Sequence, residues 1–220
     1  KKNNYQIKYI SSSNGLNSTL LAKKYDIKYS TTENSLIFND HDVNLIFITT
    51  RHNTHAELVL KGLKHNKDIF VEKPLCLNKK ELKNIEKEYR ISNSKLTIGY
   101  NRRFAPFSKI IKEALKFENS EMNIVVNVNA GYIEKSSWIQ DMKIGGGRII
   151  GEACHFIDLC IFYSDSLVSS VIMNSLGIHK EDNTDNVSIL LKHKNGSNSC
   201  INYFSNGSNK YSKERIEIYV

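Results

Sequence analysis

The sequence is short of proline and has no long apolar run. Only two of its 220 residues are proline, and its longest apolar stretches, 45–48 and 123–128, have the length of strands. A membrane-spanning helix needs about 20 apolar residues, so we expect no integral membrane protein and no membrane partner. The first residues also lack the apolar core of a secretory signal, and we expect a cytoplasmic protein.

The four cysteines, Cys76, Cys154, Cys160 and Cys200, show no short paired spacing and no C-x-x-C. Structural zinc sites and thioredoxin-type redox sites normally carry such spacings. We therefore expect no metal site, and four reduced thiols in a reducing compartment.

The sequence also lacks any block of like charge. Its 31 basic and 23 acidic residues give a net charge of +8, but the densest lysine group, at 79–87, alternates with glutamates along one helical segment. That pattern is typical of a solvated helix face, and no basic segment with interleaved aromatic residues is present. We expect no nucleic-acid partner.

What the sequence does contain, in its first half, is an alternation of strand-sized and helix-sized apolar segments. Strands are predicted at 5–10, 44–48, 68–71 and 96–99, and helices at 16–25, 36–38, 54–63 and from 78. This alternation predicts an α/β fold with a parallel sheet and crossover helices. The near-continuous apolar segment 44–48 is expected to be buried on both faces of that sheet.

The pattern changes after residue 103. Strand-like segments at 122–130, 167–176, 186–192, 199–204 and 215–220 surround one long helix at 149–162, and Asn195-Gly196 predicts a tight turn. We therefore expect residues 1–103 to form a nucleotide-binding, Rossmann-like domain. Residues 104–220 are expected to form an α+β domain with a mostly antiparallel open sheet, for substrate binding and assembly.

One signature of a dinucleotide-binding domain is missing. No G-x-G-x-x-G follows a first strand, and the only early glycine is Gly15. Two explanations stay open: the fold does not bind a dinucleotide, or its first strand and glycine loop lie outside this chain.

Polar residues follow two of the predicted parallel strands, at the edge where open α/β sheets bind ligands. The first group, 49–55, runs into a helix, where Asn53 or Thr54 could equally serve as a helix cap. The second is Glu72-Lys73-Pro74. The proline restricts the backbone before it, and an ammonium held there can bind a hydroxyl and help to move its proton, although a surface ion pair is the simpler alternative.

A third group, Gly145 to Asp158, begins with three glycines and leads into the long helix. It carries His155, with Asp158 three residues further on, on the same helix face. A histidine near a carboxylate can act as a general acid or base close to neutral pH. A buried structural histidine is the alternative.

Together these segments resemble the Gfo/Idh/MocA family of nicotinamide-dependent oxidoreductases, and the resemblance covers nearly the whole chain. The matching segments, in order, are Thr50 to His55, Glu72-Lys73-Pro74, Gly99 to Phe104, and Gly145 to Asp158. The resemblance implies a Rossmann domain that binds NAD or NADP, and hydride transfer to or from a hydroxyl carbon of a sugar, inositol or related polyol. It also implies a homo-oligomer formed through the antiparallel sheet.

The resemblance further implies roles for single residues. Lys73 would bind and polarise the reacting hydroxyl, His155 would be the general acid or base, and Glu72 would lie by the nicotinamide ribose. Thr50, His55 and Arg103 would line the cofactor cleft. Trp138, in the loop before the glycines, would face the substrate or pack beneath that loop.

The chain departs from the family pattern at three places. Arg51 and His52 replace the usual Pro-Asn, and Gly151 stands where the family commonly has an aspartate four residues before the histidine. Either Glu152 substitutes for that aspartate, or Lys73 and His155 act alone. We favour the second, because one helical residue rotates a side chain by about 100°.

At the third place Ser12 occupies the position of the ribose-binding acid, so NAD and NADP remain equally open. Since members of the family are longer at both ends, we also expect this chain to be truncated. A non-catalytic sugar-binding or assembly protein that kept the fold is the alternative function.

Overall fold

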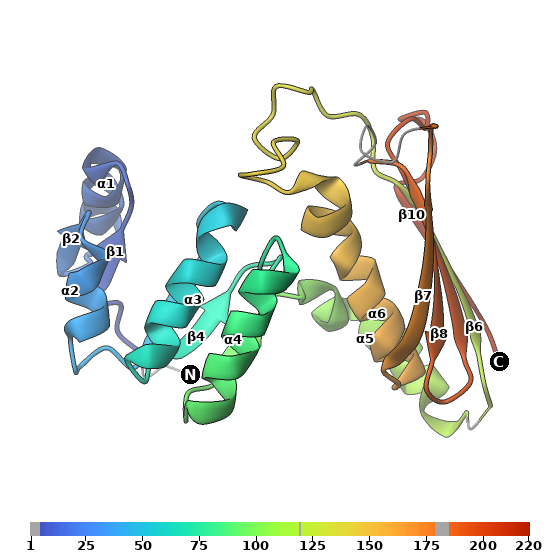
Figure 1. Ribbon diagram of the computed structural model, residues 1–220, viewed down its shortest axis with the longest axis horizontal. Helices are drawn as coiled ribbons and strands as arrows, with labels where there is room; N and C mark the ends of the chain where they lie inside the picture. The colour runs from blue at the N-terminus through green and yellow to red at the C-terminus, as the bar shows by residue number, and fades with distance from the viewer. Residues whose placement is uncertain (1–4, 119, 179–184) are drawn as a thin grey trace.

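The structure is a computed structural model that describes residues 5–118, 120–178 and 185–220. Figure 1 shows three units in chain order: a small unit with β1 and β2, a central unit with β4, and a larger sheet that ends at the C-terminus.

The first unit is a pair of strand–helix segments. β1 (Tyr9–Ser11) is followed by α1 (Gly15–Tyr25), and β2 (Tyr29–Thr31) by α2 (Asn34–Asn39). The side chain of Asn14 caps α1 by accepting a hydrogen bond from the amide of Leu16. β1 and β2 pair in parallel as a separate two-stranded sheet, and β2 is a strand that the sequence pattern did not predict.

The central unit is a three-stranded parallel sheet in the order β3-β4-β5. Its elements are β3 (Leu45–Ile48), α3 (His55–Lys64), β4 (Asp68–Val71), α4 (Lys79–Ile91) and β5 (Leu96–Ile98). The predicted α/β alternation is therefore confirmed, but the parallel strands form two separate sheets.

The prediction that 44–48 is buried on both faces is wrong. Leu45 and Phe47 are 48% and 65% exposed, whereas Ile48, on the opposite face, is buried. β3 is an edge strand of its sheet, and the core of this unit forms on the face that Ile48 shares with residues of α3 such as Val59 and Leu63. A continuous apolar run does not reveal whether both of its faces are covered.

The second half of the chain is built around a five-stranded sheet in the order β10-β6-β9-β8-β7. Its strands are β6 (Asn123–Asn129), β7 (Val168–Ser175), β8 (Val187–His193), β9 (Asn198–Phe204) and β10 (Glu214–Tyr219). All neighbouring pairs are antiparallel except β6 and β9, so the mostly antiparallel sheet is confirmed. Gly196, with φ of 94°, makes the predicted turn between β8 and β9.

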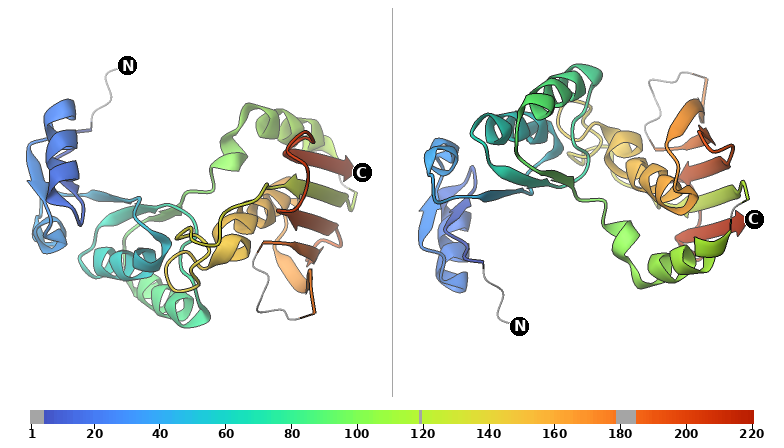
Figure 2. Two further views of the ribbon diagram at one scale, coloured as in Figure 1. Left: turned by 90° about the horizontal axis from the view of Figure 1, so that it is seen from above. Right: turned by 90° about the horizontal axis from the view of Figure 1, so that it is seen from below.

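Two helices lie on the same side of this sheet, α5 (Pro106–Ala114) and α6 (Cys154–Ser164) (Figure 2). Phe156, Leu159 and Tyr163 of α6 form one buried core with the alternate inward-facing residues of β6, β8 and β9. A second core lies within residues 48–85. No helix of the described residues is long and apolar enough to cross a bilayer.

Candidate active site

The central unit and the second half meet at the carboxyl ends of the parallel strands. Lys73, two residues after β4, donates a hydrogen bond of 2.7 Å from Nζ to the carbonyl oxygen of Gly151. The amide of Asn53 donates to the carbonyl of Ile144, and Nδ1 of His52 lies 2.8 Å from that of Gly145. The polar groups that follow β3 and β4 therefore lie against the glycine-rich segment, about 80 to 90 residues further along the chain.

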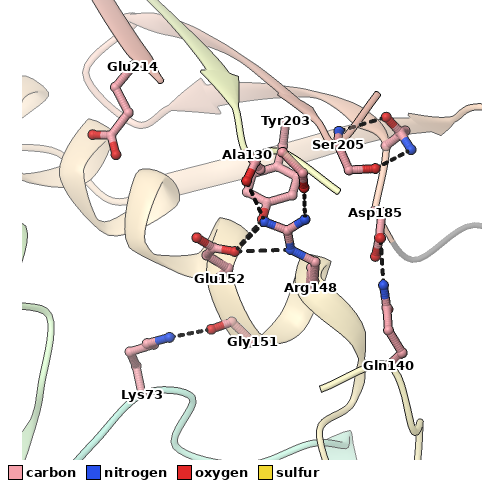
Figure 3. A network of polar contacts seen from close by, with 12 residues as sticks. Lys73, Ala130, Gln140, Arg148, Gly151, Glu152, Asp185, Tyr203, Ser205 and Glu214 are labelled. Atoms are coloured by element: carbon pink, nitrogen blue, oxygen red, sulfur yellow. Dashed lines mark hydrogen bonds and ion pairs between the residues drawn. The ribbon is translucent and has the colours of Figure 1, made fainter. Parts of the chain in front are cut away.

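The turn that receives Lys73 is irregular. Ile149–Ala153 form a π-helical turn that continues directly into α6, so the predicted long helix is present with a widened first turn. Such turns are frequent at functional sites, because the wider winding redirects the peptide groups. Here the Gly151 carbonyl is aimed at Lys73 (Figure 3).

A buried arginine holds this turn from the other side. Arg148 is 2% exposed and donates to the carbonyls of Ala130 and Gly131 and, at 3.0 and 3.2 Å, to the carboxylate of Glu152. The hydroxyl of Tyr203 donates to the same carboxylate, and the guanidinium lies 5.3 Å from the Tyr203 ring centre. Arg148 thus ties the end of β6 to the π-helical turn.

Glu152 points toward Arg148 and Tyr203, while Lys73 contacts the backbone of Gly151 (Figure 3). Burial raises the pKa of Glu152, but the hydrogen bonds from Tyr203 and Arg148 outweigh it, so the pKa is lowered and the carboxylate is charged. The Glu152 carboxylate is thus held by Arg148 and Tyr203, and it is the backbone of the neighbouring Gly151 that Lys73 contacts.

His155 is 7% exposed, and its Nδ1 is buried with no hydrogen-bond partner among the described residues. The ring meets that of Tyr100 edge-on at 6.1 Å. Burial, followed by the positive charges of Lys73 and Arg102, lowers the pKa of His155 to about 4. The imidazole is therefore neutral at pH 7, with a lone pair that can accept a proton.

The position of Asp158 on the helix suggested that it would pair with His155, but it pairs with Arg103 instead. Both of its carboxylate oxygens accept hydrogen bonds from Arg103, at 2.5 and 2.6 Å from Nη2 and Nε. Arg103 lies in the 3₁₀ turn Asn101–Phe104 after β5, so this bidentate ion pair fixes the end of the parallel sheet against α6.

The remaining residues assigned to the cofactor cleft fall into two groups. His55 is fully buried, and its ring nitrogens lie 2.8 Å from the carbonyl of Pro74 and 3.0 Å from that of Thr50. It therefore braces the loops that carry Thr50 and Lys73. Thr50 is exposed and contacts Thr54 through its hydroxyl, and the carboxylate of Glu72 lies against Gly99, where a β-carbon would be 3.1 Å from Oε1.

Ser12 lies apart from this cluster, one residue beyond β1 in the separate two-stranded sheet. Its hydroxyl donates to the carbonyl of Asn14 at the start of α1. Within the described residues no group of three or more His, Cys, Asp or Glu side chains could hold a metal ion.

The loop between β6 and the π-helical turn closes over the end of β3. Trp138 meets His52 edge-on at 4.9 Å, and the guanidinium of Arg51 lies 5.5 Å from the Trp138 ring centre. The glycines let this loop fold tightly, since a β-carbon on Gly145 would come within 2.4 Å of the Ile139 backbone, and Gly146 and Gly147 have φ near +75°.

Sequence reasoning missed three parts of this site: the Gly151 carbonyl, the Arg148–Tyr203 network, and the contact of His52 with the glycine segment. The glycine run itself lies at a close backbone approach, that of Gly145 to Ile139. No local signal, however, pairs Arg148 with a tyrosine 55 residues away on another strand.

The first half of the chain has parallel strands with polar residues at their carboxyl ends, which is the arrangement of a Rossmann-type domain. These residues face a glycine-rich turn of the second half, which is an α+β domain with an open sheet. Residues 1–100 match the GFO_IDH_MocA family, described as "Oxidoreductase family, NAD-binding Rossmann fold". These 100 residues are therefore similar to the NAD-binding domain of that family of oxidoreductases.

Similar proteins include Oxidoreductase P35 of Formosa agariphila, 30% identical over 144 residues, which are 61% of this chain and 44% of that protein. Myo-inositol 2-dehydrogenase of Thermotoga maritima is 24% identical over 188 residues, 83% of this chain and 56% of that protein. The chain thus spans about half the length of these relatives.

Among solved structures, levoglucosan dehydrogenase in complex with NADH and levoglucosan superposes with a TM-score of 0.84 at 21% identity, over 97% of this chain and 62% of that chain. A probable dehydrogenase from Thermotoga maritima superposes with a TM-score of 0.79 at 23% identity, over 96% of this chain and 65% of that one. At these identities the structures establish the shared fold.

Proposed function

We propose that the protein containing this chain is an oxidoreductase that transfers hydride between NAD or NADP and a hydroxyl carbon of a sugar, inositol or related polyol. The observation that carries the proposal is the hydrogen bond from Lys73 to the turn that leads to His155. This contact brings an ammonium group and a neutral imidazole to the same edge of a parallel sheet. Relatives named for inositol and levoglucosan dehydrogenation support the catalytic role.

The residues at this edge suit a nicotinamide cofactor. The buried Nδ1 of His155 has no partner among the described residues, and the Glu72 carboxylate, which can accept from ribose hydroxyls, lies against Gly99. Thr50 and Glu72 would hold the cofactor, and Arg103 would keep the adjacent turn in place through Asp158. A nicotinamide bound there would supply the acceptor or the donor of the hydride.

The protein's own groups handle the proton. An ammonium has three donors, so Lys73 can hold the Gly151 carbonyl with one and the substrate hydroxyl with another. His155 is neutral, and a ring nitrogen can take the hydroxyl proton during oxidation and return it during reduction. The residue division follows this scheme: 1–103 for the cofactor and 104–220 for the substrate and assembly.

The test is NAD(P)H formation by the full-length protein with a panel of inositols and sugars. Lys73→Met should lower kcat by about 10²–10⁴-fold while the circular dichroism spectrum stays unchanged. Lys79→Met, on the exposed start of α4, is the matched control and should retain activity. The proposal fails if the wild type reduces neither cofactor with any polyol, or if Lys73→Met keeps full activity.

We also propose that the protein is a cytoplasmic homo-oligomer that associates through the open face of the five-stranded sheet. That face carries exposed apolar side chains, including Ile172 at 64% and Leu190 at 50%. Replacing both with Lys should lower the mass measured by sedimentation equilibrium to that of one chain. An unchanged mass would exclude this face, and a monomeric wild type would exclude the oligomer.

A further inference from the structure

An open pocket of about 780 Å³ lies beside the candidate active site. It is lined by Arg51, three residues after β3, and by seven residues of the loop that follows β6: Lys135, Ser136, Ser137, Trp138, Gln140, Asp141 and Ile144. Its charged residues have no role in the catalysis or cofactor binding proposed above.

His52 connects a wall of this pocket to the groups proposed to handle the hydroxyl. Arg51 is followed by His52, whose ring meets Trp138 on one side. On the other side, a β-carbon at Gly151 would lie 3.0 Å from Cε1 of His52, and the Gly151 carbonyl accepts the hydrogen bond from Lys73. His52 therefore lies between Trp138, which lines the pocket, and the turn whose carbonyl holds Lys73.

The lining favours an anion. Arg51 and Lys135 bring two positive charges, and the ion pairs found within the described residues involve neither of them. The carboxylate of Asp141 is already engaged, because its Oδ1 accepts from the amides of Lys143 and Ile144. The carboxylate of Asp185 is also engaged, because it accepts a hydrogen bond from the side-chain amide of Gln140.

Arg51 also has the geometry of an oxyanion receptor. Its guanidinium lies over the Trp138 ring, 5.5 Å from the ring centre, which is a cation–π contact. The N–H donors of a guanidinium lie along the edge of its planar group. Such an edge matches the paired oxygens of a carboxylate or phosphate. The hydroxyls of Ser136 and Ser137 add uncharged donors to the same pocket.

We propose that this pocket holds an oxyanionic group of the substrate, a carboxylate or a phosphate, so that the protein acts on anionic sugars or polyols. The inference rests on the proposed oxidoreductase function and names the substrate class of that site. Arg51 and Lys135 become the residues that determine specificity.

The test is calorimetric binding of D-glucuronate, glucose 6-phosphate and glucose to the full-length protein loaded with NAD⁺ or NADP⁺. At least one anionic sugar should bind about tenfold or more tightly than glucose, and the identity of that sugar separates carboxylate from phosphate. Arg51→Gln and Lys135→Gln should each remove most of the difference without changing glucose binding. Arg51→Lys should retain part of it, and Lys143→Gln, on the same loop but outside the pocket, should retain all of it.

Equal binding of the three sugars, including no binding at all, overturns the inference. It is also overturned if Arg51→Gln weakens binding of the dinucleotide alone, because the pocket would then serve the cofactor. The two proposals fail differently. Turnover of neutral polyols that equals that of anionic ones removes only the substrate class, whereas the absence of hydride transfer with every polyol, neutral or anionic, removes the oxidoreductase function.

Discussion

The imidazole ring of His52 lies against Gly151, in the space where a side chain at position 151 would begin. A β-carbon there would be 3.0 Å from Cε1 and 3.3 Å from Nδ1 of His52. These are two of the positions at which the sequence departs from the pattern of the family that it resembles, where an asparagine and an aspartate are expected. The structure shows that the two departures are in contact, so the larger ring and the missing side chain compensate each other.

We expect Gly151→Ala to cost more stability with His52 in place than with a smaller residue. The new methyl group crowds the ring, and overpacking typically costs about 1–3 kcal/mol. A double-mutant cycle with His52→Asn, measured by urea unfolding, should therefore show a favourable coupling of about 1 kcal/mol. His65→Asn, on the exposed end of α3, is the control and should be additive with Gly151→Ala. Strict additivity in both cycles would show that the contact is unimportant.

Arg148→Met should destabilise the protein strongly. It leaves the Glu152 carboxylate buried against Tyr203 without its cation, and breaking a buried ion pair typically costs about 3–5 kcal/mol. Because Glu152 keeps 25% side-chain exposure, we expect about 3 kcal/mol in urea unfolding. Adding Glu152→Gln should recover part of the loss.

The matched control is Arg215→Met, which removes the exposed pair with Glu217 and should cost less than about 1 kcal/mol. Equal losses for Arg148→Met and Arg215→Met would contradict the role of the buried network in holding the π-helical turn.

His155 should make stability depend on pH below neutrality. Burial lowers its pKa to about 4, whereas an unfolded chain titrates near 6.5, so between these values only the unfolded state binds the proton. The free energy of unfolding should therefore fall as pH drops from about 6.5 toward 4 and should gain nothing from this group above 6.5.

His155→Asn should flatten this part of the pH profile in urea unfolding at a series of pH values. A remaining slope is expected from His52, whose pKa burial also lowers. His41→Asn, an exposed site, should leave the profile as it is. A wild-type slope that His155→Asn does not change would show that the imidazole titrates alike in both states.

The Arg103–Asp158 ion pair should hold the end of the parallel sheet in place against α6. Arg103 is one-third exposed, so solvent weakens the pair and Asp158→Asn should cost about 1 kcal/mol or less. The effect of Asp158→Asn on activity should exceed its effect on stability and should appear mainly in kcat. The reason is that Asp158 lies one helical turn after His155 and holds the 3₁₀ turn of Arg103 beside that part of α6. Unchanged kcat in Asp158→Asn would limit the pair to a structural role.

The sequence by itself determined the order and type of most elements and the segments that carry chemistry. Apolar spacing is a local property, so the strand at 68–71 and the turn at Gly196 follow from neighbouring residues alone. The glycine run is likewise a local feature, and only glycine tolerates the close backbone approach found at Gly145.

Only the tertiary structure decided which groups meet. The exposure of Phe47 depends on what covers each face of β3, and the partner of Asp158 turned out to be an arginine from another element rather than the nearby histidine. Glu152 accepts hydrogen bonds from Arg148 and Tyr203, and Lys73 donates to the backbone carbonyl of Gly151 instead. Such choices depend on packing between residues far apart in the chain, and no local pattern of residues records them.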